Sequence, residues 1–285
     1  EDLVTYFSGL TGLILLELGS PIAQQMSERL MKFVKDEMLE SHLWMWSAIG
    51  SDLRKYIPPD IDTTSINAEL IMRYGIDFKG DNILLKNTPN RKKMGFYTWI
   101  VPRLKLKGVN FADILSIVRH SFYSLYFWRL TGCFPNQFAD ISSTNAFYLL
   151  MQKDSDLIKD AEVFLSRFQD IDSMNDFSYR NIFIKRFFVS RILRFSDNKI
   201  LRERFSPSCS AIEHLSDLEL SCLILTSSNF SQPIPSGWRE ELKSRQQKNG
   251  NWSENDVFCY GGIFEWNCPG LNTALALAAI NDVKF

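Results

Sequence analysis

The sequence predicts an all-α protein of about a dozen helices, because a helix and its connection take roughly two dozen residues and the chain has 285. Apolar residues recur with the helical period, whereas the alternation typical of half-buried strands is scarce. Residues that cap helices stand before several of the apolar runs. This number of helices suits a closed ring of six hairpins, but periodicity alone leaves an irregular bundle and a solenoid open.

Two amphipathic helices are predicted in the first third of the chain. The first has Ser20 as its N-cap and Pro21 at its first helical position. Its apolar face consists of Ile22, Met26, Leu30, Phe33 and Val34. The second shows the same spacing over residues 66–74, and Gly75 is expected to end it.

Further helices are expected along the rest of the chain. Ser216 and Glu219 have the spacing of a capping box before an apolar run, and a last helix covers residues 271–279 after a Cys-Pro-Gly break. Other helical segments lie near residues 111–130, 146–151, 160–168 and 180–195. None of the breaks between them resembles a domain linker, so we expect a single domain over residues 1–285.

Composition and charge argue against several classes of partner. With 32 basic and 33 acidic residues the net charge is −1, which offers little attraction to nucleic acid or to an anionic membrane. The apolar stretch from Leu10 to Leu18 is about half of a membrane span, so no transmembrane helix is predicted, and peripheral membrane contact stays open. Five cysteines without a CxxC pair indicate a reducing, cytoplasmic location. The sequence opens at Glu1, which leaves targeting undecided.

One acidic segment gives the clearest indication of function. The residues Pro58-Pro59-Asp60-Ile61-Asp62-Thr63-Thr64-Ser65 resemble the acid motif of class II terpenoid cyclases, DxDD followed by Thr and a small residue. In this resemblance Asp62 matches the Asp that donates the proton. Thr63 stands where the last Asp is expected, a departure similar to that of oxidosqualene cyclases, in which a single Asp is followed by Cys-Thr-Ala.

A second motif supports the same family. The segment from Gln246 to Trp252 matches the QxxxGxW repeat of that superfamily, in which the Gln and the Trp tie outer helices to the following turn. Gly261-Gly262 and the small residues at 273–277 are similar to the helix that follows the repeat. Weaker matches lie at residues 95–99 and 140–145, so the resemblance spans roughly residues 55–282.

The resemblance implies a fold, a reaction and a substrate. The fold is a single (α/α)6 toroid over residues 1–285, like the β-type domain of class II cyclases of the squalene-hopene cyclase kind. The reaction is a protonation-initiated cyclisation, or a cyclase-like isomerisation, of an isoprenoid chain in an apolar cavity without a redox cofactor. In the family the active site lies between this domain and a second helical domain, and we expect this chain to hold only one of the two.

The acid motif also makes chemical sense by itself. Protonating an alkene or an epoxide needs an acid that stays neutral and dry until the substrate arrives. An apolar cavity raises the pKa of a carboxyl by desolvation, and a neighbouring carboxylate raises it further. We therefore expect Asp62 to be the general acid on an irregular segment before the helix, with Asp60 tuning it and Thr63 and Thr64 orienting it by hydrogen bonds.

The same residues also suit a purely structural role, because Asp, Thr and Ser before an apolar helix are typical capping residues. For the cavity, Tyr97 and Trp99 are candidates since ring faces stabilise carbocations, although core packing is the ordinary role of such rings. Asp140 and Asn145 are further candidates for substrate binding.

Other constellations give weaker predictions. Basic residues gather between Arg180 and Arg204, where they suit either a substrate pyrophosphate or, more simply, a solvated helix face. The three histidines have no metal-ligand spacing, so no metal site is predicted, and Mg²⁺ is expected only if the substrate is a diphosphate. A carboxylate pair of Asp62 and Asp140 would suit a glycosidase instead.

The competing prediction is a non-catalytic toroid that binds a lipid or a partner protein. The two differ in the surroundings of the acid motif. A cyclase needs Asp60 and Asp62 at the bottom of an enclosed apolar cavity, whereas a binding module would leave them exposed or merely capping a helix.

Overall fold

Most of the described chain is helical, as the periodicity predicts. The computed structural model describes residues 4–51, 54, 57–88, 90–100, 138–176, 178–207, 212–253, 256–260 and 264–285. This part of the chain forms twelve helices and one pair of short strands. None of its helices is long and apolar enough to cross a membrane. The helix predicted near residues 111–130 and the Gly261-Gly262 pair lie outside the described residues.

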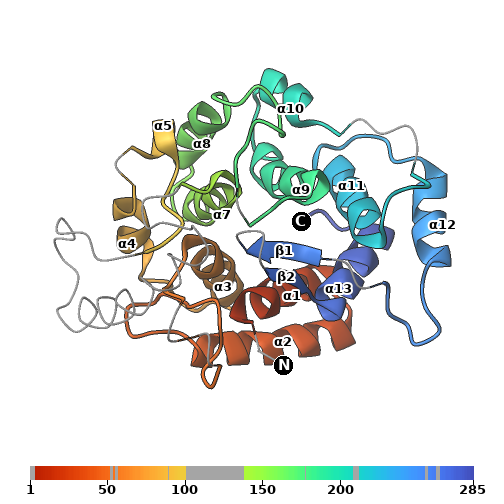
Figure 1. Cartoon of the computed structure of the whole chain (residues 1–285), viewed down its shortest axis with the longest axis horizontal. Helices are drawn as coiled ribbons and strands as arrows, with labels where there is room; N and C mark the ends of the chain where they lie inside the picture. Colours follow the sequence, from red (N-terminus) through yellow and green to blue (C-terminus); the bar gives the residue numbers. More distant parts are fainter. Residues whose placement is uncertain are drawn as a thin grey trace.

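Six helices contact one another in a closed circuit, and we call them the inner helices. They are α1 (Thr5–Leu18), α3 (Ile61–Arg73), α7 (Asp140–Met151), α9 (Ile182–Leu193), α11 (Asp217–Asn229) and α13 (Pro269–Ile280). Each packs against the next in this order, and α13 packs against α1. The six therefore surround a common centre (Figure 1).

Several inner helices have no solvent face. Every residue from Ile61 to Ile71 in α3 and from Asp140 to Leu150 in α7 is buried. A helix that is buried all round has to satisfy its polar side chains internally. Serines do so within their own helix: Ser143 Oγ, for example, donates to the carbonyl of Ala139 at 2.6 Å. Longer polar side chains need partners on neighbouring helices.

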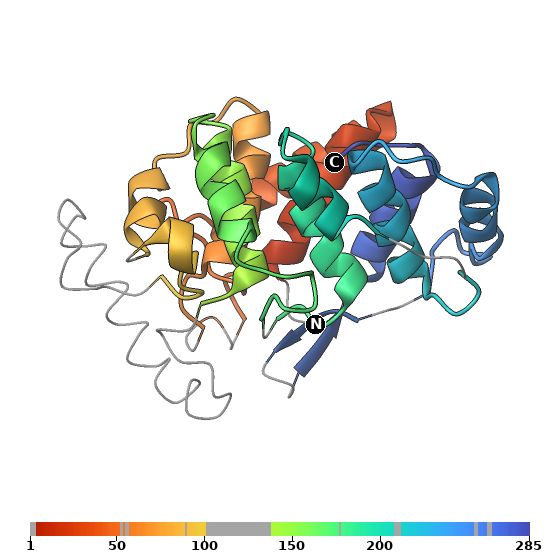
Figure 2. The same ribbon diagram turned by 90° about the horizontal axis from the view of Figure 1, so that it is seen from above.

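The remaining helices lie outside the inner ones (Figures 1 and 2). They are α2 (Pro21–Asp36), α4 (Asp81–Lys86), α5 (Arg91–Met94), α8 (Leu157–Leu165), α10 (Lys199–Phe205) and α12 (Ser236–Ser244). Each longer outer helix packs on an inner helix next to it in sequence: α2 on α1, α8 on α7, α10 on α9, and α12 on α11 and α13.

Helix α2 buries only part of the predicted face: Val34 is buried and Leu30 and Phe33 are half-buried, but the first two residues of that face are exposed. Ile22 is 73% exposed and Met26 is 48% exposed. The buried residues of α2 are Ala23, Ser27, Met31 and Val34. The reason is a close approach to α1, where Ser27 Oγ donates to the carbonyl of Gly12 at 2.7 Å. Such an approach suits a small side chain at the contact, so Ser27 is buried there while Ile22 and Met26 remain exposed.

Several predicted helix ends are confirmed. Ser20 caps α2 by accepting a hydrogen bond from a backbone N–H in its first turn. Both hydrogen bonds of the capping box between Ser216 and Glu219 are present at the start of α11. Gly75 follows α3 with a φ of +76°, a conformation that favours glycine and stops the helix.

A short antiparallel ribbon was not predicted. Its strands are β1 (Asp256–Tyr260) and β2 (Phe264–Asn267), and the pairing is irregular between Asp256 and Phe258. The ribbon lies over the centre of the inner helices in Figure 1 and beyond their ends in Figure 2, so it covers one end of the circuit. Strands of this length are too short to give a clear alternating pattern.

Residues 246–252, the QxxxGxW segment, form the turn after α12. Gln246 Nε2 donates to the carbonyl of Gly250 at 2.8 Å and closes the turn. Trp252 is buried, and its indole N–H donates to the carbonyl of Leu242 at 2.7 Å. Leu242 lies in the last turn of α12, where carbonyls have no partner within the helix.

The same contact recurs at the other side of the molecule, without the sequence motif. The indole N–H of buried Trp44 donates to the carbonyl of Val34 in the last turn of α2, also at 2.7 Å. In both cases the tryptophan follows its acceptor by ten residues. An indole therefore ties the end of an outer helix to the turn behind it in two separate hairpins.

We predict that Trp44→Phe and Trp252→Phe each lower the free energy of unfolding by about 1–3 kcal/mol, because each leaves a helix-end carbonyl unpaired in the core. Urea denaturation measures the change. Trp238→Phe is the matched control, since Trp238 lies half-buried on α12 and its indole makes no hydrogen bond to a described residue. Equal losses in all three variants would contradict the role of the two indole hydrogen bonds.

Candidate functional site at the start of α3

The acid motif forms the first turn of α3. Asp60 is the N-cap, and its Oδ1 accepts a hydrogen bond from the backbone N–H of Thr63 at 2.7 Å. The helix begins at Ile61, ahead of the predicted pattern at Ile66, so Asp62 lies in the helix and not on an irregular segment. The carboxyls of Asp60 and Asp62 are both buried. Asp60 therefore has the predicted capping role, whereas the side chain of Asp62 does not cap the helix.

Each oxygen of Asp62 has a partner from a different part of the chain. Nδ2 of Asn145 in α7 donates to Oδ1 at 2.6 Å. The hydroxyl of Tyr179, in the segment before α9, is hydrogen-bonded to Oδ2. The same hydroxyl is hydrogen-bonded to the hydroxyl of Tyr6 in α1. Three inner helices and the approach to a fourth therefore meet at one carboxyl.

The surroundings of Asp62 favour its neutral form. Burial raises the pKa of Asp62 to about 8, and the nearby charges of Asp60 and Asp176 act in the same direction. The hydrogen bonds from Tyr179 and Asn145 favour the ionised form and offset part of this rise. Burial likewise raises the pKa of Asp60 to about 7. The net effect is a pKa of Asp62 above its usual value, which favours the protonated carboxyl.

The two threonines of the motif have other partners than predicted. Thr63 contacts Asp60 through its backbone N–H. The hydroxyl of Thr64 accepts a hydrogen bond from the backbone N–H of Trp44 at 3.1 Å, which ties α3 to the turn after α2. Neither hydroxyl bonds to Asp62 among the described residues. The side chains that orient Asp62 come from α7 and from the segment before α9 instead.

A buried ion pair behind Asn145 has no counterpart in the sequence predictions. Nη2 of Arg191 in α9 lies 2.5 Å from Oε2 of Glu69 in α3, and the two side chains are 1% and 3% exposed. Nη1 of Arg191 donates to Oδ1 of Asn145 at 3.4 Å. The guanidinium also lies 4.1 Å from the ring centre of Tyr148. The signal in the sequence was a charged residue within an otherwise apolar helical run, at both positions.

Several basic residues between Arg180 and Arg204 have separate partners inside the protein. Arg191 is buried in the ion pair with Glu69. Lys185 Nζ donates to the carbonyl of Met174 at 2.9 Å, and Arg204 Nη1 donates to that of Phe168 at 2.8 Å. Lys185 and Arg204 thus hold main-chain segments, whereas Arg180 and Lys199 are exposed to solvent.

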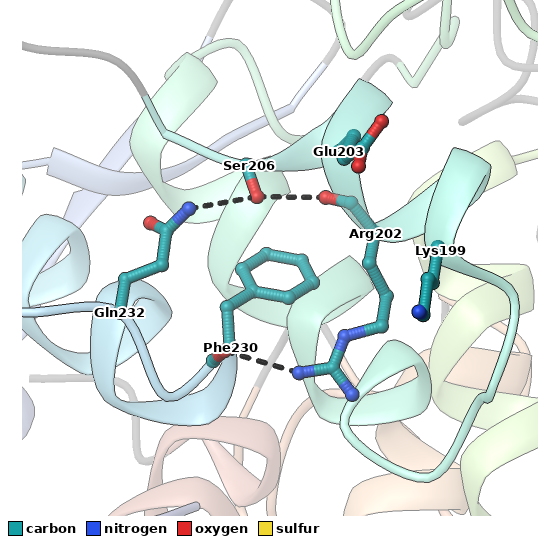
Figure 3. Close-up of a pocket in the computed structure, with 6 residues that line it drawn as sticks. All are labelled: Lys199, Arg202, Glu203, Ser206, Phe230 and Gln232. Atoms are coloured by element: carbon teal, nitrogen blue, oxygen red, sulfur yellow. Dashed lines mark hydrogen bonds between the residues drawn. The ribbon is translucent and has the colours of Figure 1, made fainter.

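Two residues of that run line a pocket of about 210 Å³ between α10 and the segment after α11 (Figure 3). Its lining consists of Lys199, Arg202, Glu203, Ser206, Phe230 and Gln232. Arg202 Nη2 donates to the carbonyl of Phe230 at 3.0 Å, and Ser206 is hydrogen-bonded to both Gln232 and the carbonyl of Arg202. Lys199 and Arg202 bring two positive charges to this lining and Glu203 one negative charge.

Two of the predicted cavity residues border the cap of α3. Trp99 is buried and pairs with Asp60 in an isolated antiparallel bridge. Tyr97 is half-buried and stacks on Phe138 with a distance of 4.3 Å between ring centres. The structure thus brings the segment of Tyr97 and Trp99 beside the acid motif.

Asp140 is the first residue of α7 and is engaged locally. Its Oδ2 accepts a hydrogen bond from the backbone N–H of Asn175 at 2.7 Å, and burial raises its pKa to about 6. Asp176 accepts hydrogen bonds from two backbone N–H groups at the same helix start. Asp60 and Asp176, rather than Asp140, are the carboxylates whose charges act on Asp62.

The described residues contain no group of three His, Cys, Asp or Glu side chains placed to hold a metal ion. Two cysteines in this part of the chain are free, Cys222 in the core and Cys268 at a half-buried position before α13. Cys133 and Cys209 lie outside the described residues.

Comparisons with known proteins find a similar fold but no family. No family model matches the sequence, and no curated protein matches it. Among solved structures, the crystal structure of a protein from Actinoplanes is similar with a TM-score of 0.67. The match covers 99% of this chain and 92% of that chain at 13% sequence identity. At this level of identity the likeness shows a shared fold alone.

We predict that the free energy of unfolding falls as the pH rises from about 5 to about 8. Asp60 and Asp62 bind protons more tightly in the folded chain, with pKa values of about 7 and 8, than in the unfolded chain, where an aspartate titrates near 4. Their contribution is therefore complete at low pH and is lost as the pH passes the folded pKa values. The full effect is about 1.4 kcal/mol for each unit of pKa difference.

Urea denaturation at a series of pH values measures this slope. Asp62→Asn keeps a neutral side chain of the same shape and should flatten the profile. Asp172→Asn, at an exposed position, should leave the slope of the parent protein unchanged. A profile that rises over this pH range, or one that Asp62→Asn does not alter, would contradict the protonated state of Asp62.

We also predict that Arg191→Met destabilises the protein by about 3–5 kcal/mol, because it leaves the charge of Glu69 buried without a partner. Glu69→Gln added to this variant should restore part of the loss. Arg194→Met, one turn away at a half-buried position, is the control and should cost much less. Thermal and urea unfolding of the three variants measure the differences, and equal losses in both single variants would contradict the prediction.

Proposed function

We propose that this protein is a protonation-initiated cyclase, or a cyclase-like isomerase, that acts on an isoprenoid chain with Asp62 as its general acid. One observation carries the proposal: Asp62 is a buried carboxyl whose pKa is raised to about 8. An acid that protonates an alkene has to stay neutral until the substrate arrives. The substrate class comes from the resemblance of the acid motif and of the QxxxGxW segment.

Asp60 is proposed to tune this acid. Its Oδ2 is buried and has no hydrogen-bond partner among the described residues, while its Oδ1 caps α3. Its negative charge raises the pKa of Asp62. A change in the protonation of Asp60 would therefore alter the strength of the acid without any movement of the backbone.

The proposed architecture is a single (α/α)6 toroid over residues 1–285. The closed circuit of inner helices, each longer outer helix packed beside its sequence neighbour, supports it. The repeated contact of Trp44 and Trp252 with the end of an outer helix supports a recurring hairpin unit. The end of the circuit that carries Asp62 is the proposed site of chemistry.

Further parts of the proposal concern the surroundings of the acid. Tyr97 and Trp99 are proposed to contact the substrate beside the acid motif, where their ring faces would stabilise a carbocation. Asn145 and Asp140 are proposed to lie near the substrate, Asn145 through its contact with Asp62. No cofactor is needed unless the substrate is a diphosphate, in which case Mg²⁺ would neutralise it. A cytoplasmic protein without a nucleic-acid partner fits the cysteine and charge patterns.

The experiment is incubation of the protein with C10 to C30 isoprenoids as hydrocarbons, alcohols and diphosphates, with product analysis by mass spectrometry. We predict that Asp62→Asn lowers product formation by about 100-fold or more, the usual worth of a general acid. The rate of the parent protein should fall above pH 8, because the acid form of Asp62 is then lost.

Asp172→Asn serves as the control and should form product at the parent rate. Unchanged product formation in Asp62→Asn would refute the acid role. Tight binding of an isoprenoid without any product would favour the alternative of a lipid-binding module.

A further inference from the structure

The proposed acid has to meet two requirements that oppose each other. It must stay neutral until the substrate arrives, and burial favours this by raising the pKa of Asp62 to about 8. The same burial makes Asp62 a weaker acid, because the carboxylate that remains after proton transfer is poorly solvated. A hydrogen-bond donor that stabilises the carboxylate as it forms reduces this cost. The amide of Asn145 is such a donor, since its Nδ2 lies 2.6 Å from Oδ1 of Asp62.

An amide side chain can present either of its two ends to a carboxyl. When Nδ2 of Asn145 faces Asp62 it donates, and the hydrogen bond favours the ionised carboxylate. In the flipped orientation the amide oxygen would accept the acid proton and favour the neutral form instead. A protonated carboxyl has both a donor and an acceptor, so it does not select one orientation by itself. The acid strength of Asp62 therefore depends on which end of the amide faces it.

The guanidinium of Arg191 selects the orientation in which the amide donates to Asp62. It has N–H donors only and keeps its positive charge, and its Nη1 lies 3.4 Å from Oδ1 of Asn145. A flipped amide would turn Nδ2 toward the guanidinium and set donor against donor. The hydrogen bonds to Arg191 and to Asp62 are thus satisfied together in only one orientation.

The guanidinium is itself held firmly. Its Nη2 lies 2.5 Å from Oε2 of Glu69, and the two side chains are 1% and 3% exposed. The ring centres of Tyr148 and Phe285 lie 4.1 Å and 4.7 Å from it. Glu69 belongs to α3, as Asp62 does, and the two lie about two turns apart on that helix. Helix α3 therefore carries both the acid and the residue that anchors Arg191.

We propose that Arg191, anchored by Glu69, is a positioning residue that makes the Asn145 amide donate to Asp62 and so strengthens the acid. This inference rests on the proposed function. As the O–H bond of Asp62 breaks and a C–H bond forms at the substrate double bond, Oδ1 gains negative charge and the hydrogen bond from Nδ2 becomes stronger. The carbocation later releases a proton as its new double bond forms, so the protons balance.

The test measures the pKa of Asp62 and needs no substrate. The infrared C=O band of protonated Asp62 is the band that Asp62→Asn removes at pH 6, and its loss with rising pH gives the pKa. Arg191→Met combined with Glu69→Gln removes both charges of the pair and leaves no buried ion unpaired. We expect the pKa of Asp62 to rise by about one unit or more in this variant, because the amide is then free to accept the acid proton.

Two comparisons separate this effect from a general loss of structure. Arg73→Met combined with Glu17→Gln removes another ion pair, with a distance of 3.1 Å, at the far end of α3 and should leave the pKa of Asp62 unchanged. Asn145→Leu removes both polar ends of the amide. In that background, replacing the Arg191 and Glu69 pair should no longer change the pKa, because the pair acts through the amide.

The other titratable groups near Asp62 are the same in all these variants. Among the described residues they are Asp60, Asp176, Tyr179 and, beyond Tyr179, Tyr6. The charges of Asp60 and Asp176 raise the pKa of Asp62 in the parent protein and in each variant alike. A difference in pKa between the variants therefore reports on the replaced pair.

The outcomes separate this inference from the function on which it rests. An unchanged pKa after replacement of the Arg191 and Glu69 pair, or an equal rise in the Asn145→Leu background, would overturn the inference and leave Asp62 as the acid. Absence of any carboxylic band removed by Asp62→Asn would overturn the acid and the inference together. If the paired replacement does not fold, Arg191→Gln combined with Glu69→Gln takes its place, because two neutral amides can pair where the ions stood.

With an isoprenoid that the protein converts, the positioning role has a second signature. Replacing the Arg191 and Glu69 pair should lower kcat up to about tenfold and leave KM unchanged, because a weaker acid transfers its proton more slowly. The fall in rate expected above pH 8 should move to higher pH by the same shift as the pKa. A lower rate with an unmoved pH profile would overturn the positioning role and leave Arg191 as a support of the fold.

Discussion

A buried carboxyl at position 62 has to find hydrogen-bond donors inside the protein, and this requirement joins four parts of the chain. Asp62 lies in a helix without a solvent face, so its partners come from α7 and the approach to α9, and Tyr6 in α1 is joined to it through Tyr179. Burial of an ionisable group costs free energy unless the group is neutral or well matched. Both conditions hold for Asp62, because its pKa is raised and each of its carboxyl oxygens has a hydrogen-bond partner.

The ion pair of Arg191 and Glu69 belongs to the same arrangement. A buried pair of this kind contributes little net stability, because desolvation offsets much of the attraction between the charges. Its position gives it a different use. By holding one side of the Asn145 amide, Arg191 determines which group that amide presents to Asp62. A charge pair remote from the carboxyl thus fixes the direction of the hydrogen bonds around it.

The ends of the outer helices α2 and α12 have carbonyls without a partner in the helix, and these need donors from elsewhere. Trp44 and Trp252 cover these carbonyls with an indole N–H and fill the space behind the turn with the same ring. The acid motif lies close to the first of these turns, since Thr64 is hydrogen-bonded to Trp44. The scaffold and the candidate site are therefore linked directly, and the fold shared with the Actinoplanes protein at 13% identity provides a frame on which such a site can be built.

The sequence by itself determined the helical class, most helix positions, the caps at Ser20 and Ser216, and the acid motif, because periodicity and capping are local properties. Tertiary structure decided which part of the apolar face of α2 is buried, because Ser27 contacts α1 closely while Ile22 and Met26 are exposed. It also decided the partners of Asp62, because Asn145 and Tyr179 lie 83 and 117 residues away along the chain. A local pattern can show that a carboxyl will be buried, but only the packing of distant helices determines which donors reach it.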